Sequence, residues 1–239
     1  MLQLRPHQQE VVDKIKLGFQ NGHQCQLLYA PTGFGKTETA MYIMREIADD
    51  YKKAAMVMDR IVLVEQTSLR LGKYGIDHGV MQSGHWREKP HERIQICSAQ
   101  TIEKRGTDLN IDLLIIDECH VQRRGTKEFI QNNPDIKVIG LTATPFTAGL
   151  GETYSHVVGA SSTGDLIENG WLCPLRVFLA KEIDMEGAKK VAGEWSEGDI
   201  AERGIKIVGD IVSEWVRKTN EIFGKPVKTI VFCAGVAHG

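Results

Sequence analysis

The chain has 239 residues, of which 42% are hydrophobic and 25% charged, and its formal net charge is -2. This composition is close to the globular average and excludes collagen-like, coiled-coil and wholly disordered chains. No apolar run approaches the ~20 residues of a membrane-spanning helix, and the N-terminus has no apolar signal segment. The five cysteines are scattered without a C-x-x-C pair, which argues against a disulfide framework or a structural zinc site. We therefore expect a cytoplasmic, monomeric protein with no membrane association.

Short apolar segments alternate with helical patterns over the first 145 residues. Pro6 opens the first helix, in which Val11, Ile15 and Phe19 lie on one face. A second helix is predicted over residues 37–48, where apolar residues recur at helical spacing. Strands are predicted at residues 26–30, 54–58, 93–98, 111–117 and 136–141. Because most of them are continuously apolar, they indicate a parallel α/β sheet that is covered on both faces.

The pattern changes after Pro145. Residues 146–162 are rich in glycine, threonine and serine and are predicted to form a loop. A short helix is expected around residues 165–170, a strand at 176–180, a hinge or insertion at 184–204, a long helix at 205–223 and a strand at 229–233. We expect residues 1–180 to form one complete domain and residues 181–239 to form a hinge and the incomplete start of a second.

A glycine-rich turn follows the first predicted strand and precedes a helix. It reads Ala30-Pro31-Thr32-Gly33-Phe34-Gly35-Lys36-Thr37, with alanine where the strict phosphate-binding pattern begins with glycine. Gly33 and Gly35 allow successive N–H groups to face a phosphate chain at the positive end of the helix dipole. Lys36 supplies positive charge to the β- and γ-phosphates, and the Thr37 hydroxyl is a ligand for Mg²⁺. This context favours a P-loop over an ordinary turn, and it assigns residues 31–37 to ATP binding.

Two carboxylates close another apolar strand, in the run Leu113-Leu114-Ile115-Ile116-Asp117-Glu118-Cys119-His120. Asp117 stands where a P-loop ATPase carries the acid on the metal side of its site. Glu118 is the candidate general base for a water that attacks the γ-phosphate. Alone, such a strand end could equally be a solvated turn, but the P-loop upstream favours a paired site. The sequence therefore predicts ATP hydrolysis with Mg²⁺ held by Thr37 and Asp117, and with Lys36, Asp117 and Glu118 as catalytic residues.

Together these motifs resemble those of superfamily 2 helicases and translocases of the DEAD/DEAH-box kind. That family carries A-x-T-G-x-G-K-T, then D-E-x-H, then T-A-T or S-A-T, and the third motif here is Thr142-Ala143-Thr144. Within the superfamily the chain is similar to bacterial RadD-type repair helicases and related phage helicases. The shared features are L-R-P-x-Q-Q, D-E-C-H, L-T-A-T-P-F and a segment like residues 168–172. The resemblance implies a RecA-like P-loop domain with a mostly parallel sheet, followed by the truncated start of a second RecA-like lobe.

The resemblance also implies roles for residues outside the P-loop. Arg5 and Gln8, in a motif similar to the family's Q-type motif, would hydrogen-bond the adenine edge and favour ATP over GTP. By itself, L-R-P-x-Q is equally the start of a helix with proline in its first turn. His120 would couple the ATP site to Thr142-Ala143-Thr144 through hydrogen bonds across the interlobe cleft. That tripeptide would relay the nucleotide state to the nucleic acid.

Two further segments resemble family motifs that contact the phosphates of one nucleic-acid strand. Residues 60–67 look like motif Ia and residues 97–101 look like motif Ib, although each could equally be a capped strand-to-helix turn. Residues 229–238 resemble motif IV, which begins the second lobe. The candidate nucleic-acid contacts are Arg60, Gln66, Ser98, Gln100 and Thr101.

One polar stretch contains His78, His85 and His91, with Cys97 nearby, and suggests a metal site. The spacing matches no common zinc pattern, so a solvated loop is the preferred interpretation. Residues 86–93 also combine a tryptophan with basic side chains, which is typical of a strip facing nucleic acid, but a solvated charged loop is again favoured.

These observations predict an ATP-dependent motor that moves on nucleic acid or unwinds it, with DNA favoured over RNA. Two alternatives stay open. One is a double-strand DNA translocase of a restriction or remodelling complex, and the other is a truncated nucleotide-gated module that binds nucleic acid without turnover. Because no arginine-finger motif can be placed before Gly239, we expect only weak hydrolysis by this chain.

Overall fold

The computed structural model describes residues 2–82, 84–105, 109–177, 186–187, 189–191, 194–195 and 208–231. The chain divides into two compact units, Met1–Cys173 and Pro174–Gly239. The domain boundary predicted between residues 180 and 181 lies outside the described residues and stays a prediction. No helix of the described part is long and apolar enough to cross a membrane.

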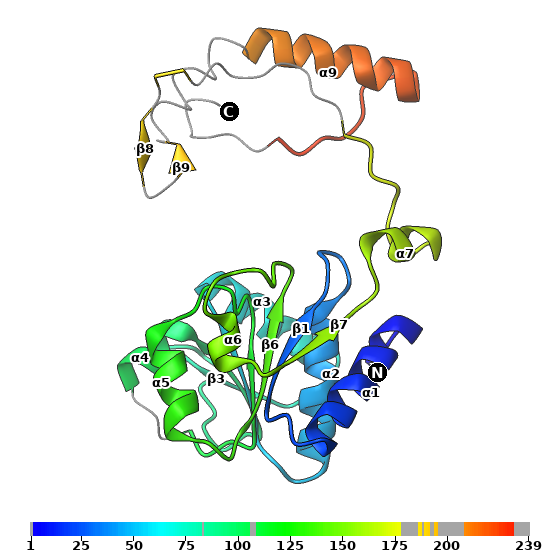
Figure 1. Ribbon diagram of the computed structural model, residues 1–239. Coiled ribbons are helices and arrows are strands. Elements are labelled where there is room, and N and C mark those ends of the chain that lie inside the picture. Colours follow the sequence, from blue (N-terminus) through cyan, green and yellow to red (C-terminus); the bar gives the residue numbers. More distant parts are fainter. Residues whose placement is uncertain are drawn as a thin grey trace. The chain divides into compact units, whose positions relative to one another are not determined.

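A seven-stranded sheet forms the centre of the first unit, in the order β3-β4-β2-β5-β6-β1-β7 (Figure 1). All of its pairings are parallel. The five predicted strands are confirmed, with ends that shift by at most two residues. The strands are β1 Cys25–Tyr29, β2 Ala54–Met58, β3 Gly79–Met81, β4 Ile94–Ser98, β5 Leu113–Ile116, β6 Lys137–Thr142 and β7 His156–Gly159.

Helices cover both faces of this sheet (Figure 1). Alternate strand residues point to opposite sides: Leu28, Met56 and Ile115 share a core with α1, α2 and α3. Their neighbours Leu27 and Val57 share the other core with α4, α5 and α6. Burial on both sides explains why the strands are continuously apolar. The helices are α1 Pro6–Gln20, α2 Lys36–Asp49, α3 Ile61–Lys73, α4 Ala99–Arg105, α5 Arg124–Asn132, α6 Leu150–Thr153 and α7 Thr163–Glu168.

The loop predicted over residues 146–162 is wrong in part, because this stretch contains α6 and the edge strand β7. β7 is short and pairs only with β1, from Gln26↔His156 to Tyr29↔Gly159. Its register against a neighbouring strand, and not its local composition, makes it a strand. β3 was also absent from the prediction, since three residues are too few for a periodic signal.

The second unit contains the predicted long helix, observed as α9 Val208–Phe223. A two-stranded antiparallel hairpin, β8 Lys190–Val191 and β9 Glu194–Trp195, was not predicted. The strands predicted at residues 176–180 and 229–233 are wrong for residues 176–177 and 229–231, which form neither strand nor helix. Their remaining residues lie outside the described part of the chain.

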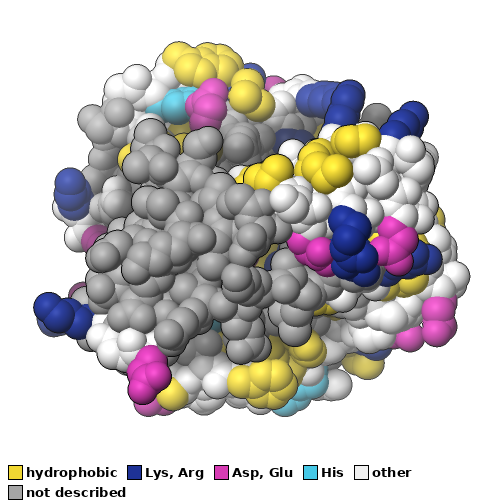
Figure 2. Space-filling view, turned by 90° about the horizontal axis from the view of Figure 1, so that it is seen from above, with side chains coloured by type: hydrophobic (Ala, Val, Ile, Leu, Met, Phe, Trp, Pro, Cys, Tyr) yellow, Lys and Arg dark blue, Asp and Glu magenta, His cyan; other side chains and the backbone are white. Residues whose placement is uncertain are grey.

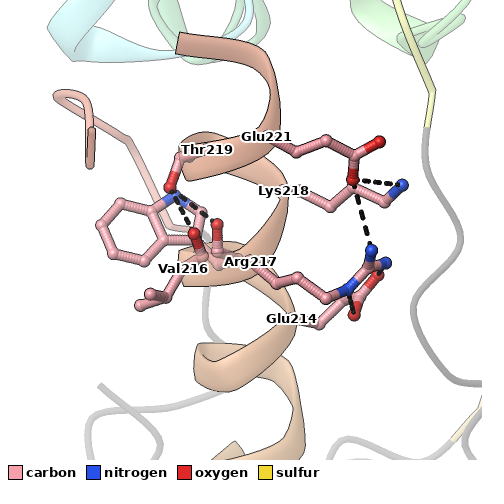
Figure 3. A network of polar contacts seen from close by, with 7 residues as sticks. Glu214, Val216, Arg217, Lys218, Thr219 and Glu221 are labelled. Atoms are coloured by element: carbon pink, nitrogen blue, oxygen red, sulfur yellow. Dashed lines mark hydrogen bonds and ion pairs between the residues drawn. The ribbon is translucent and has the colours of Figure 1, made fainter. Parts of the chain in front are cut away.

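Polar side chains on α9 contact one another at helical spacing (Figure 3). The Arg217 guanidinium binds Glu214 and Glu221 at 2.5 and 3.2 Å. The Thr219 hydroxyl donates to the Trp215 carbonyl at 2.8 Å, and the Trp215 indole donates to the Thr229 hydroxyl at 2.9 Å. The last contact holds the segment after the helix against it. Because these ion pairs are exposed to solvent, they contribute little to stability.

Gly140 in β6 provides a test of the packing beneath the sheet. A Cβ atom at this position would lie 2.5 Å from Cζ of the buried Tyr154 ring. We expect Gly140→Ala to lower the free energy of unfolding by about 1–3 kcal/mol, because the ring or strand must shift. Urea denaturation measures this change. Gly159→Ala is the matched strand control, since nothing lies within 4 Å of its added Cβ. Equal stability of the two variants would contradict the packing described.

Candidate functional site

Three loops meet at the carboxyl edge of the sheet. The P-loop follows β1, residues 117–120 follow β5, and residues 143–145 follow β6. Because β6 lies between β5 and β1, the end of β6 separates the other two loops and contacts both. The Ala30 N–H donates to the Thr142 carbonyl at 3.1 Å, and the Cys119 N–H donates to the Leu141 carbonyl at 3.0 Å. This edge is where parallel α/β sheets bind their ligands.

The P-loop depends on two glycines in the left-handed region, Gly33 at φ +85° and Gly35 at φ +93°. Residues with a side chain rarely adopt this backbone conformation, so glycine is required at both positions. The Phe34 side chain between them is fully buried in the core, so only the backbone of this residue takes part in the surface of the loop. Thr32 is exposed, and Pro31 and Thr37 are half-buried.

Lys36 begins α2 and folds back over the loop. Its Nζ donates to the Ala30 carbonyl at 2.9 Å and to the Pro31 carbonyl at 3.4 Å. Burial lowers the pKa of Lys36, while the charges of Glu118 and Asp117 oppose that shift. The ammonium therefore lies close enough to interact electrostatically with both acids. Its two carbonyl partners are neutral, so a phosphate oxygen can replace them.

Asp117 and Glu118 follow β5 and are both half-buried. Burial and then the Glu118 charge raise the pKa of Asp117, whereas the Glu118 N–H and Lys36 lower it. The Glu118 N–H donates to Asp117 Oδ1 at 3.1 Å. Glu118 has φ +48°, which is rare for a residue with a side chain. This conformation turns the chain at the end of the strand, as is common at functional sites.

A row of polar contacts leads from Glu118 to the end of β6. His120 Nδ1 lies 3.2 Å from Glu118 Oε2 and 3.3 Å from the Thr142 hydroxyl. The Thr144 N–H donates to the same hydroxyl at 2.9 Å. Ala143 between the two threonines is half-buried. The structure thus brings together Glu118, His120, Thr142 and Thr144.

Gln8 lies beside the P-loop but is occupied by contacts within the protein. Its Nε2 donates to the Phe34 carbonyl at 3.1 Å, and its Oε1 accepts from the Arg5 N–H at 2.9 Å. The side chain is only 4% exposed. Gln8 therefore ties α1 to the P-loop, and its contact with adenine stays a prediction.

The turn after α7 also contacts the P-loop region. The sequence patterns did not predict this contact. The Arg5 guanidinium lies over the Trp171 ring at 4.8 Å from its centroid. The adjacent Leu172 packs on the P-loop, since a Cβ on Gly33 would lie 2.7 Å from Leu172 Cδ2. Residues 168–172 had been noted for a family likeness without any role. A possible signal was Asn169-Gly170, which is typical of a helix end.

The candidate nucleic-acid contacts follow two neighbouring strands, β2 and β4, whose last residues Met58 and Ser98 are in register. Arg60, Gln66 and Gln100 are exposed, whereas Ser98 is buried and accepts the Thr101 N–H at 3.2 Å. Most of residues 60–67 is helix, because α3 begins at residue 61.

An ion pair connects this region to the acids. The Arg123 Nε donates to Asp59 Oδ1 at 2.8 Å, linking the end of β2 to the loop after β5. On the face drawn in Figure 2, the described basic side chains lie among acidic and hydrophobic ones and do not gather in a single patch.

The solvated-loop interpretation is wrong for two of the three histidines. His78 is 1% exposed, with its Nε2 at 2.9 Å from the Ser68 hydroxyl, and burial lowers its pKa. His85 has its Nε2 2.6 Å from Glu65 Oε2, while His91 is exposed as predicted. These side chains pack α3 against the following loop. Across the described residues, no group of three or more His, Cys, Asp or Glu side chains could hold a metal ion.

The parallel sheet and the three loops at its carboxyl edge define the N-terminal RecA-like lobe of a superfamily 2 helicase. Comparison of the sequence with known families agrees with this class. The chain belongs to the family described as "Type III restriction enzyme, res subunit", whose model matches residues 1–147.

Curated relatives include the "Type I restriction enzyme EcoAI endonuclease subunit" of Escherichia coli, 25% identical over 98% of this chain and 33% of that protein. A "51.5 kDa protein" of a Lactococcus phage is 24% identical over 81% of this chain and 41% of that protein. The chain therefore spans well under half the length of these relatives.

Solved structures share the fold. The UvsW helicase from bacteriophage T4 gives a TM-score of 0.55 at 16% identity, over 65% of this chain and 59% of that one. The Hef helicase domain of Pyrococcus furiosus gives 0.55 at 20% identity, over 70% and 40%. The type ISP restriction-modification enzyme LlaBIII, whose structure is described as bound to DNA, gives 0.53 at 18% identity, over 70% and 16%.

Proposed function

We propose that this chain is the ATP-hydrolysing part of a motor that moves on DNA. The family supports an ATP-dependent nucleic-acid motor in general terms. The observation that carries the finer proposal is the continuous set of contacts from the P-loop through Thr142 to His120 and Glu118. Such a set gives the nucleotide site a physical connection to the surface formed after β6.

In the proposed reaction a water attacks the γ-phosphorus in line with its bond to the β–γ bridging oxygen; that bond breaks, ADP leaves and inorganic phosphate forms. Glu118 accepts the proton of that water, and Lys36 moves from the loop carbonyls to the phosphate oxygens. Gly33 and Gly35 let the backbone N–H groups of the P-loop point at the phosphate chain.

Mg²⁺ fits the residues present. Asp117 offers carboxylate oxygens, and its pKa is raised by burial and then by the neighbouring Glu118; Thr37 offers a half-buried hydroxyl. Oxygen ligands next to excess negative charge suit a hard divalent cation. When bound, the cation would neutralise charge on the β- and γ-phosphates.

DNA is the proposed track, with contacts from Arg60, Gln66, Gln100 and Thr101, while the buried Ser98 would act by holding Thr101. We also propose that residues 181–239 are a hinge and the start of a second lobe. The test is phosphate release from ATP with single-stranded DNA, duplex DNA or RNA, with Glu118→Gln as blank. Stimulation by DNA supports the proposal, and stimulation by RNA alone contradicts the track. ATP binding with no turnover above the blank would favour a nucleotide-gated binding module.

A second candidate is translocation on duplex DNA without strand separation. The relative from Escherichia coli is a restriction endonuclease subunit, and one structural neighbour is a SWI2/SNF2 ATPase core in complex with dsDNA, at a TM-score of 0.50. Displacement of a third strand from a triplex without unwinding of a forked duplex would favour this candidate. Unwinding of the fork would favour a helicase.

His120 allows coupling to be separated from hydrolysis. We expect His120→Ala to leave ATPase activity without nucleic acid within about threefold of wild type, because the imidazole links Glu118 to Thr142 and supplies no proton. Stimulation by DNA should fall by about tenfold or more. Parallel ATPase assays with and without duplex DNA measure both rates. Loss of both activities together would show that His120 acts in the chemical step.

A further inference from the structure

We propose that Trp171 is a positioning residue of the nucleotide site. Its ring holds the Arg5 guanidinium in place, so that the free face of the guanidinium can stack on the base of the bound nucleotide. This inference rests on the proposed function, because it assumes that the P-loop binds ATP. It adds the turn after α7 to the elements that recognise the base.

The Arg5 backbone is fixed relative to the P-loop. Its N–H donates to Gln8 Oε1, and the Gln8 amide in turn donates to the Phe34 carbonyl at 3.1 Å. The Arg5 side chain is exposed, and among the described residues its guanidinium forms no ion pair. Its contact with Trp171 is therefore the feature that restricts where this long side chain lies.

Trp171 is itself held firmly by the backbone. Its N–H donates to the Leu166 carbonyl at 2.8 Å, and the Gly170 N–H donates to the Ile167 carbonyl at 3.0 Å, with Gly170 at φ +72°. This pattern is a Schellman motif, which ends a helix in one defined geometry. The carbonyl that accepts from Trp171 belongs to Leu166, which is 1% exposed, so the motif is anchored in the core.

The Trp171 ring also contacts the P-loop through His7. The indole and the His7 ring meet edge to face at 5.4 Å, and the His7 ring meets the Phe34 ring in the same way at 5.0 Å. Burial lowers the pKa of His7, whose ring lies between Trp171 and Phe34 of the loop. Trp171 is thus placed relative to the phosphate site by both its backbone and its side chain.

The chemistry of the pair allows a base to stack on the guanidinium. A guanidinium is planar and stacks on aromatic surfaces with either face. The Arg5 Cζ lies over the indole at 4.8 Å from the ring centroid, so no base can lie between the two. In the proposal a purine stacks on the guanidinium from the side turned away from the indole. An ordered guanidinium also loses less side-chain entropy when a base binds, which strengthens the contact.

The experiment compares ATP with inorganic tripolyphosphate, which has the phosphate chain without a base. A fluorescent ATP analogue is bound to the 239-residue chain and is displaced by either compound. We expect Trp171→Ala to weaken ATP binding by about five- to tenfold and to leave tripolyphosphate binding unchanged. Trp171→Phe should restore most of the loss. Arg5→Ala should match Trp171→Ala, and the double variant should be no weaker than either single one.

Trp86→Ala is the matched control, because Trp86 is exposed and also carries an arginine, Arg87, at 4.8 Å. It should bind both compounds like wild type. Unchanged ATP binding by Trp171→Ala, an equal loss for both compounds, or additive effects of the Arg5 and Trp171 changes would each overturn the inference. If wild type binds tripolyphosphate as tightly as ATP, the proposed role of Trp171 is wrong but the proposed function still stands. If wild type binds neither compound, the proposed function fails as well.

Discussion

Glu118→Gln is expected to lower the rate of phosphate release by about 10²–10⁴-fold, because an amide cannot accept the proton of the attacking water. ATP affinity should change little, since Glu118 touches His120 and Asp117 and not the P-loop backbone. Glutamine has the same shape as glutamate and can adopt the same backbone φ of +48°, so the turn after β5 should be retained. Single-turnover hydrolysis and equilibrium ATP binding measure the two effects separately.

Glu128→Gln is the control for this variant. Glu128 is an exposed acid on α5 that pairs with Arg124 at 2.7 Å, away from the three loops. It should hydrolyse ATP at the wild-type rate. Turnover by Glu118→Gln at a similar rate would remove Glu118 from the role of general base and leave Asp117 as the acid to test next.

Lys36→Ala should weaken ATP binding by about 100-fold or more, because a charge-assisted contact to the phosphates is lost. The effect on folding should be small. Among the described contacts the ammonium donates to the carbonyls of Ala30, which is buried, and of Pro31, which is half-buried, so the substitution leaves one loop carbonyl within reach of water. Equilibrium titration with ATP gives the affinity, and urea denaturation shows whether the fold is retained.

Lys14→Ala on α1 removes an equally long cation that pairs only with Glu10 at 2.7 Å among the described contacts. Its ATP affinity should equal that of wild type. A Lys36→Ala variant that binds ATP as tightly as this control would mean that the phosphates lie elsewhere, and the P-loop assignment would then be wrong.

The central sheet could be predicted because most of its longer strands are largely apolar runs. Burial on both faces requires this pattern, as Leu27 and Leu28 illustrate by packing into opposite cores. The P-loop and the acids after β5 could be predicted because their chemistry demands particular residues next to particular elements. Their meeting at one edge then follows from parallel strands.

The rest depended on contacts between distant segments. β7 is a strand because it lies beside β1, and no local pattern expresses that pairing. His78 looked like a residue of a polar loop, yet Ser68 from α3 and the Ile76 carbonyl bury and satisfy its ring. Trp171 lies 166 positions from Arg5 in the sequence, and only the fold brings their side chains together.

The burial of the cysteine beside the candidate general base has a consequence for chemical labelling. Burial raises the pKa of Cys119 to about 12, and that of Cys97 to about 12 as well. At pH 8 about one such thiol in ten thousand is a thiolate, the form that reacts with maleimides. Burial also raises the pKa of the half-buried Cys25, whereas Cys173 is exposed. Among these four cysteines, a maleimide dye should therefore attach first to Cys173, two residues after Trp171 and at the last position of the first unit. The native sequence thus offers a place for a fluorophore next to Leu172, which packs on the P-loop, without alteration of Asp117 or Glu118.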